Sequence, residues 1–202
     1  MATVWAAIVV EYRRHRVSQQ YNNLNIGSFC TAATPFSAYP KLKGRGAEVR
    51  DLVLPLSVVW RSLMKDSARN RRVADVFDTQ VQMQTMLHDH AHEVFLPPAK
   101  AKKFTQLVYS YLKEYSKLAN EADKDKELLF SMVIKFHYLH HMGSRAPFLN
   151  PRKGNTMIDE DFVGKCKDIV AACAHGTEAH AVPEKFMERY IWGKWIVMTY
   201  GP

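Results

Sequence analysis

The sequence predicts a mainly α-helical protein: a single-domain bundle of about six to seven helices with an irregular N-terminal arm. Three observations lead to this prediction. From residue 46 onward, apolar side chains recur at the spacing of helices that bury one face. Proline, glycine and capping residues divide this pattern into segments of helical length. Hydrophobic residues make up 47% of the 202 and charged residues 24%, a composition that is typical of a domain able to bury a core.

The N-terminal part of the chain differs from the remainder. A helix is predicted over residues 1–17, because aromatic and aliphatic residues recur there at helical spacing ahead of a basic cluster. Residues 18–45 predict an irregular basic arm, with a short strand at 24–29, because Asn, Gly and Pro interrupt any period. Residues 46–202 then form the helical domain.

Six helices are expected within that domain. The first two span 47–64 and 67–92. The third begins at residue 98 and ends at a polar turn at 120–125. The last three span 126–142, 156–176 and 183–198. Pro55 should kink or split the first, and Gly143 should end the fourth in a left-handed conformation. Thr156 and Asp159 have capping-box spacing at the start of the fifth. In the last helix we expect these residues to face inward: Phe186, Met187, Tyr190, Ile191 and Trp195.

The sequence favours an intracellular location, in the nucleus or an organelle. No apolar run approaches the roughly 20 residues that span a bilayer, and no basic residue precedes the first apolar stretch as in a secretory signal. Three cysteines are too few for a disulfide framework and indicate a reducing compartment. The acid-free segment between Glu11 and Glu48 also resembles an organelle transit sequence.

The formal charge of +8 points to phosphate-rich or acidic partners. Many basic proteins bind no nucleic acid, so the distribution of the cations matters more than their number. Arginines in the first turns of the 67–92 helix lie at a positive helix end, where a bound anion or plain solvation could accommodate them. The candidate nucleic-acid-binding residues are Arg13, Arg14, Arg16, Arg69, Arg71, Arg72, Lys100, Lys102 and Lys103.

Histidines and acids offer weaker candidates for chemistry. His88 and His92 have the i, i+4 spacing of a transition-metal pair, but no further ligand is identifiable. In the segment 134–141 at least one imidazole should face the core, as a hydrogen-bonded structural histidine. The acidic residues at 159–161 could bind Mg²⁺ or could stabilise the N-terminus of a helix through its dipole. The second role is favoured. Cys166, Cys173, His175 and His180 lack zinc-site spacing, so we predict core packing, no metal and no cofactor.

The sequence also gives little support for an enzyme. It contains no glycine-rich phosphate loop, no Gly-x-Ser-x-Gly elbow and no dinucleotide fingerprint. A catalytic role would require the weak candidates His137, His140 and Glu160 to converge in one pocket.

One stretch resembles a known family. It runs Lys135-Phe-His137-Tyr-Leu-His140, then Asn150-Pro-Arg152, then Thr156 and Asp159-Glu160-Asp161-Phe162 with Lys165. This stretch is similar to the C-terminal region of CACTA-type transposase-like proteins and to related repeat-element proteins of protists, with a looser likeness at residues 39–48. Ile134 stands where that family has proline, and no upstream catalytic domain with paired aspartates is present. The resemblance therefore implies a transposon-derived, non-catalytic helical domain.

The sequence thus predicts a nucleic-acid-associated helical domain of transposable-element descent that contacts phosphates through the cations named above. The alternative is a structural accessory subunit of a larger, organellar assembly, with the basic N-terminal arm wrapping neighbouring protein subunits.

Overall fold

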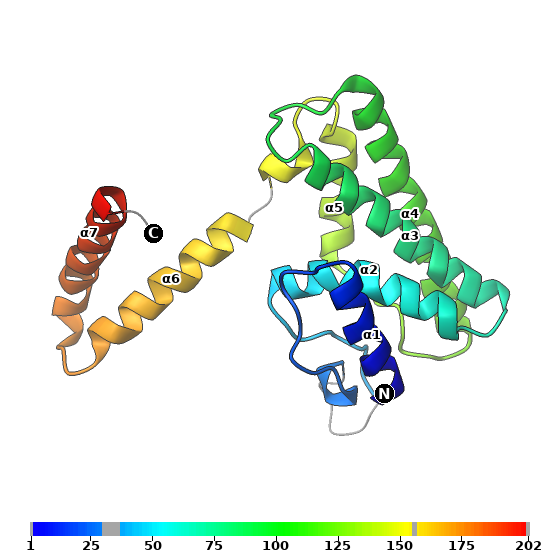
Figure 1. Ribbon diagram of the computed structural model, residues 1–202, viewed down its shortest axis with the longest axis horizontal. Coiled ribbons are helices and arrows are strands. Elements are labelled where there is room, and N and C mark those ends of the chain that lie inside the picture. Colours follow the sequence, from blue (N-terminus) through cyan, green and yellow to red (C-terminus); the bar gives the residue numbers. More distant parts are fainter. Residues whose placement is uncertain (1, 30–36, 155–156, 201–202) are drawn as a thin grey trace. The chain divides into compact units, whose positions relative to one another are not determined.

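The computed structural model describes residues 2–29, 37–154 and 157–200. Its regular elements are seven α-helices and three short 3₁₀ helices, with no strand among the described residues, which confirms the predicted all-helical architecture (Figure 1). The chain divides into two compact units, Met1–Gly154 and Asn155–Pro202. The boundary lies within the predicted helical domain 46–202.

Unit 1 holds five α-helices that pack in chain order. Each helix contacts the next one along the chain, so the unit is built from neighbouring helix pairs (Figure 1). The helices are α1 (Ala2–Arg14), α2 (Gly46–Leu63), α3 (Ala68–Asp89), α4 (Pro98–Lys124) and α5 (Ile134–Arg145), followed by the 3₁₀ helix η2 (Pro151–Gly154). The bounds of the first three lie close to those predicted.

Two hydrophobic clusters stabilise unit 1. One joins α1, α2 and the arm through Ile8, Tyr12, Leu24, Leu52 and Val59. The other joins the end of α3 to α4 and α5 through Met83, Leu96, Ala101, Phe104, Leu107, Val108 and Ala146. Both follow the predicted apolar faces, since burial of these faces supplies most of the driving force for helix packing.

The described part of the N-terminal arm packs against its own unit. Leu24 is buried in the α1–α2 cluster, and Leu42 packs against the same cluster. The predicted strand at 24–29 is wrong: the 3₁₀ helix η1 (Ile26–Ser28) lies there, and the Asn25 N–H donates to the Ser28 hydroxyl at 3.1 Å. This local side-chain bond gives the backbone an alternative to a strand ladder. Residues 30–36, including Cys30, lie outside the described residues.

Proline marks helix boundaries less strictly than predicted. Pro55 neither splits nor ends α2, which continues to Leu63 with Pro55 buried inside it. Ser67 and Pro98 behave as expected, because the Ser67 hydroxyl accepts a hydrogen bond from the Asn70 N–H at 3.1 Å and Pro98 occupies the first turn of α4.

The region around residue 125 departs most from the prediction. The prediction of a polar turn at 120–125 is wrong, because α4 continues to Lys124. Leu118 and Ala122 are buried along the apolar face of this helix. The helix predicted from residue 126 begins only at Ile134. Tertiary contacts hold the intervening segment: Phe130 packs edge-on against Tyr115 at 5.8 Å, and the Tyr115 hydroxyl donates to the Ser131 carbonyl.

Gly143 does not end a helix. It lies inside α5 and is buried, and a Cβ atom there would come within 2.8 Å of Val108 Cγ1. The Thr105 hydroxyl donates to the Gly143 carbonyl at 2.7 Å. The glycine therefore permits α5 to approach α4 closely, which explains its position better than helix termination does.

Unit 2 is a helical hairpin of α6 (Met157–Ala174) and α7 (Val182–Tyr200), joined through Gly176, whose φ is +69°, and the 3₁₀ helix η3 (Ala179–Ala181). Cys173 is buried, as core packing predicts. Phe186 and Tyr190 are half-buried, but the predicted inward orientation is wrong for Met187, Ile191 and Trp195, which are exposed. The predicted cap residue Thr156 lies outside the described residues. Within the described chain, no helix combines the length and apolar character needed to cross a membrane.

Candidate anion-binding cleft

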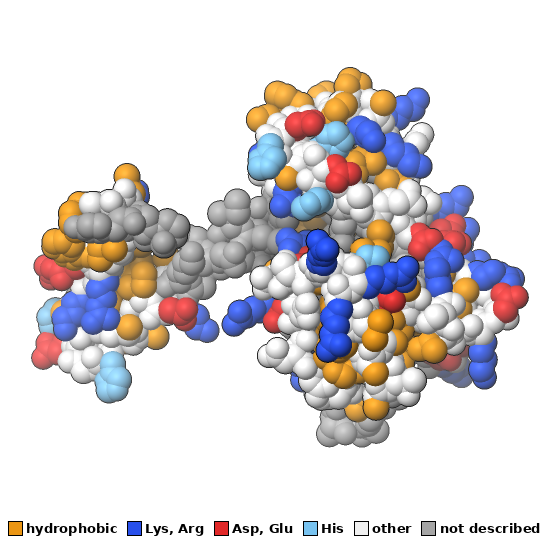
Figure 2. All heavy atoms as spheres, viewed as in Figure 1, with side chains coloured by type: hydrophobic (Ala, Val, Ile, Leu, Met, Phe, Trp, Pro, Cys, Tyr) orange, Lys and Arg blue, Asp and Glu red, His pale blue; other side chains and the backbone are white. Residues whose placement is uncertain are grey.

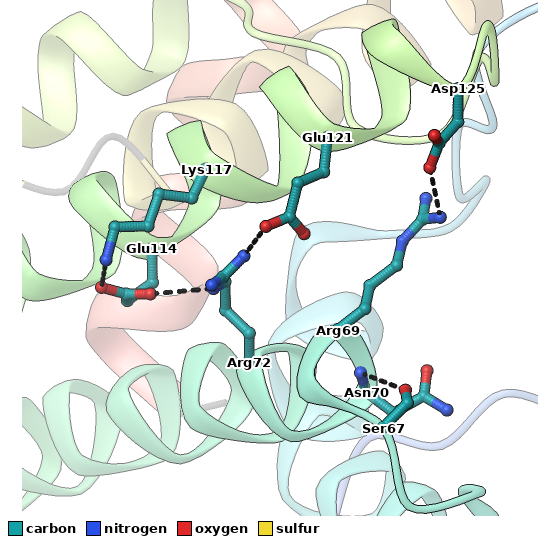
Figure 3. A network of polar contacts seen from close by, with 8 residues as sticks. All are labelled: Ser67, Arg69, Asn70, Arg72, Glu114, Lys117, Glu121 and Asp125. Carbon is teal, nitrogen blue, oxygen red and sulfur yellow. Dashed lines mark hydrogen bonds and ion pairs between the residues drawn. The ribbon is translucent and has the colours of Figure 1, made fainter.

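The three α3 arginines predicted to contact nucleic acid have partners within unit 1. Arg72 pairs through Nε with Glu114 at 3.2 Å and through Nη1 with Glu121 (Figure 3). Arg69 pairs with Asp125 at 3.4 Å and with Glu127, and Arg71 pairs with Asp66. These carboxylates, most of them on α4 and just after it, neutralise the cations that the sequence left without an explanation.

Glu114 is the centre of this network. It accepts a hydrogen bond from Lys117, at 2.7 Å, and forms an ion pair with Arg72 (Figure 3). The hydrogen bond from Lys117, with the nearby charges of Lys117, Arg72 and Lys113, lowers the pKa of Glu114 below its ordinary 4.5. These ion pairs join α3 to α4. Because their arginines are already paired with carboxylates, we leave them out of the candidate site.

The predicted cations of α1 and α4 are exposed. Arg14 lies 3.7 Å from Glu11, and the others have no ion-pair partner among the described residues. On the face of unit 1 shown in Figure 2, Lys and Arg side chains lie among Asp and Glu side chains. Among the predicted binding residues, the cations without an ion-pair partner in the described part of the chain are Arg13, Arg16, Lys100, Lys102 and Lys103.

A polar cleft of about 550 Å³ gathers basic side chains from separate elements of unit 1. It is lined by the residues after α1, by α2, by α3 and by η2. Its charged and imidazole side chains are Arg16, Arg50, Arg152, His15, His88 and Asp51. A cleft of this size is within the range that holds small ligands or part of a larger one.

Arg16 reaches this cleft from an unusual backbone conformation. After α1 ends, the Val17 N–H donates to the Tyr12 carbonyl at 3.0 Å, and Arg16 takes a φ of +50°. Glycine is the usual residue at such a helix end, because other side chains cost on the order of 1 kcal/mol there.

Arg152 is held by a buried asparagine. The Asn150 side chain is fully buried; its Nδ2 donates to the carbonyls of His90 and Glu93 at 2.8 and 2.9 Å, and its Oδ1 accepts from the Arg152 N–H at 3.0 Å. The Asn150 N–H donates to the Val94 carbonyl at 2.9 Å. These bonds tie η2 to the α3–α4 connection and place Arg152 at the cleft.

The cleft carries a positive charge. Its one lining carboxylate, Asp51, accepts hydrogen bonds from Arg50, at 2.5 Å, and from Ser18, at 3.4 Å. The hydrogen bond to Asp51 raises the pKa of Arg50, so this guanidinium stays charged. Arg16 and Arg152 have no ion-pair partner among the described residues, which leaves two guanidinium groups available to an anion.

Sequence reasoning found Arg16 but missed Arg50 and Arg152 as site residues. Arg152 had a signal, because it belongs to the Asn-Pro-Arg motif quoted for the family resemblance. Arg50 had none, since it lies on a helix whose apolar face dominates the pattern.

The other sequence candidates do not assemble into a catalytic or multidentate site among the described residues. His137 and His140 are exposed on α5, His140 packs at 5.5 Å from the Tyr109 ring, and no imidazole of this helix enters the core. The side chain of Glu160 lies outside the part of the chain that the structure describes. No group of three or more His, Cys, Asp or Glu side chains that could hold a metal ion is found within that part.

The two histidine pairs with i, i+4 spacing differ in the structure. α3 ends at Asp89, so His88 and His92 are not one helical turn apart, and His90 Nδ1 lies 2.8 Å from Glu93. His137 and His141 do share α5. Desolvation, followed by the charges of His137, Arg145 and His140, lowers the pKa of His141.

No family model, curated protein or solved structure matches the chain. The resemblance to CACTA-type transposase-like proteins therefore stays a prediction, and the cleft must be interpreted from its own chemistry.

Proposed function

We propose that unit 1 is a non-catalytic nucleic-acid-binding module that grips the phosphate backbone at the cleft of Arg16, Arg50 and Arg152. The observation that carries the proposal is that three arginines from different elements line one cleft, and that the cleft has a single lining carboxylate, Asp51. Guanidinium is the side-chain group best matched to phosphate, because its planar donors can bond two oxygens at once.

The surroundings of the cleft favour a long anion over a small one. Arg13 is exposed and lies near the same end of α1, where it can contact a neighbouring phosphate. Phosphates repeat at short, regular intervals along a strand, so separate cations each add to the affinity. The proposal is independent of transposable-element descent, which remains a separate prediction from the sequence resemblance.

The alternative, an organellar accessory subunit with a wrapping arm, is less well supported. Leu24 and Leu42 of the arm pack against the α1–α2 cluster, so moving the arm onto a neighbour would expose both. That rearrangement would cost about 1.5–3 kcal/mol for the buried Leu24 side chain and less for the half-buried Leu42 side chain.

The test is salt-dependent binding of the full chain to a duplex oligonucleotide, followed by fluorescence anisotropy. If about three phosphates are neutralised, affinity should fall about fortyfold between roughly 50 and 200 mM salt. Arg152→Gln should weaken binding and lower the slope of log affinity against log salt by about 1. The matched control is Arg71→Gln, since Arg71 is exposed but paired with Asp66 and lies outside the cleft.

Arg16→Gly separates binding from folding. Glycine relieves the positive φ at this position, so the variant should be as stable as the parent or more so, by up to about 1 kcal/mol, while duplex affinity falls. The proposal is wrong if Arg16→Gly and Arg152→Gln bind the duplex with the slope and affinity of Arg71→Gln, or if the parent chain shows no salt-dependent binding.

A further inference from the structure

Helix α5 brings two imidazoles into direct contact outside the cleft. His137 and His141 lie one helical turn apart, with their Nε2 atoms 3.0 Å apart and their ring centroids 4.4 Å apart. The rings are nearly perpendicular, at 82°. Both side chains are exposed, so an ion from solution can reach the two nitrogens without any change in the core.

The separation of the two nitrogens fits a shared metal ion. For a metal–nitrogen distance of about 2.05 Å, ligands at about 90° lie about 2.9 Å apart and ligands at about 109° lie about 3.3 Å apart. The observed 3.0 Å lies between these values, which correspond to square-planar and tetrahedral coordination. The two nitrogens form a hydrogen bond with each other in the structure, so the rings must turn to aim both lone pairs at one ion, but the distance between the nitrogens need not change much.

We propose that His137 and His141 form a two-ligand site for a divalent transition-metal ion of the class that prefers imidazole, namely Zn²⁺, Ni²⁺ or Cu²⁺. Water completes the coordination, because no further His, Cys, Asp or Glu of the described chain joins the pair. His140 does not take part, since its ring packs against Tyr109. The site is separate from the phosphate-binding cleft, which neither histidine lines.

The chain supplies an internal comparison for this inference. His88 and His92 have the same spacing in the sequence, but α3 ends between them. If sequence spacing alone produced metal binding, both pairs would bind. If helical geometry is required, only the α5 pair will do so.

The experiment is calorimetric titration of the full chain with Zn²⁺ alone. We expect one site, and His137→Gln or His141→Gln should weaken it by at least about tenfold, since the loss of even an outer-shell partner commonly costs that much. His140→Gln and the double variant His88→Gln/His92→Gln should bind Zn²⁺ as the parent does. Mg²⁺, which prefers oxygen ligands, should give no signal at this site.

Histidine ring-nitrogen NMR gives a second readout that does not depend on affinity. Zn²⁺ should shift the Nε2 resonances of His137 and His141 and leave those of His140 unchanged. Circular dichroism will show whether each variant keeps its helices, which we expect because both side chains are exposed. Equal Zn²⁺ affinity in the parent and in both single variants, or binding that disappears only in the His88/His92 double variant, would overturn the inference.

Discussion

At the scale of single residues, the Asn150 side chain ties η2 to the α3–α4 connection. Asn150 is fully buried, and its side chain bonds two carbonyls of the α3–α4 connection and one N–H of η2. A buried amide with both ends satisfied stabilises the fold and fixes its neighbours, whereas a buried group that loses its partner is costly. Arg152 therefore depends on Asn150 for its place at the cleft.

Asn150→Asp should be destabilising although the side chain keeps its size. A carboxylate cannot donate to the carbonyls of His90 and Glu93, so its oxygens would face two carbonyl oxygens. We expect this to lower the free energy of unfolding by about 2–3 kcal/mol. Urea unfolding should show a lower midpoint with an unchanged slope. Asn23→Asp, on the exposed arm, should change the stability by no more than about 0.5 kcal/mol. An Asn150→Asp variant as stable as the Asn23→Asp control would contradict this account of Asn150.

The residue scale is also where sequence analysis had the least to work with. Arg69, Arg71 and Arg72 stand together near the start of a helix, where a bound anion and plain solvation were both open explanations. Most of their partners are 49 to 58 residues away along the chain, on α4 and just beyond it. Local sequence carries no sign of such pairing, because it depends on which faces of α3 and α4 meet.

At the scale of elements, the helices of unit 1 were largely predictable and their ends were not. Apolar periodicity located α2, α3 and α4, because burial of one face dominates their stability. It failed at residues 120–133, where polar composition indicated a turn but the buried Leu118 and Ala122 keep α4 helical. It failed again at Gly143, because a glycine needed for close helix packing looks the same in sequence as one that ends a helix.

Gly143→Ala should be destabilising, contrary to helix propensity. Alanine favours a helix by about 1 kcal/mol over glycine, but its Cβ would lie 2.8 Å from Val108 Cγ1, and overpacking of this kind costs about 1–3 kcal/mol. We expect a net loss on the order of 1 kcal/mol in thermal or urea unfolding.

Two further variants test that explanation. Val108→Ala removes the Cγ1 atom at 2.8 Å but keeps the Cβ atom at 3.0 Å, so adding Gly143→Ala to it should cost less than adding it to the parent, and the double-mutant cycle should show a favourable coupling. Gly193→Ala, in α7, meets no atom within 4 Å and should increase helicity. Additive effects of Gly143→Ala and Val108→Ala would show that the close approach of α4 and α5 is not the cause.

At the scale of the whole molecule, no pattern in the sequence indicates that the chain forms two compact units. Composition and periodicity continue across residue 154, so residues 46–202 were expected to form one domain. The two large hydrophobic clusters both lie in unit 1, while unit 2 is a hairpin of two helices in which α7 keeps large apolar side chains exposed. A division of this kind depends on long-range contacts, which a periodic pattern does not encode.

A chain ending at residue 154 should fold by itself. Because it retains both clusters and the cleft, it should unfold cooperatively with a midpoint within about 3 °C of the main transition of the full chain, and it should bind duplex with the same salt slope. Differential scanning calorimetry and fluorescence anisotropy measure these two quantities. A fragment without a cooperative transition would mean that residues 155–202 help to stabilise unit 1.

The division into units also separates the intrinsic chromophores. Of the four tryptophans, Trp5 and Trp60 lie in unit 1 and are partly shielded from solvent, whereas Trp192 and Trp195 lie on α7 and are 62% and 50% exposed. Emission from the first pair should therefore be blue-shifted relative to the second. A chain that carries phenylalanine at the two α7 positions would report optically on the cleft-bearing half of the protein alone, with no added dye.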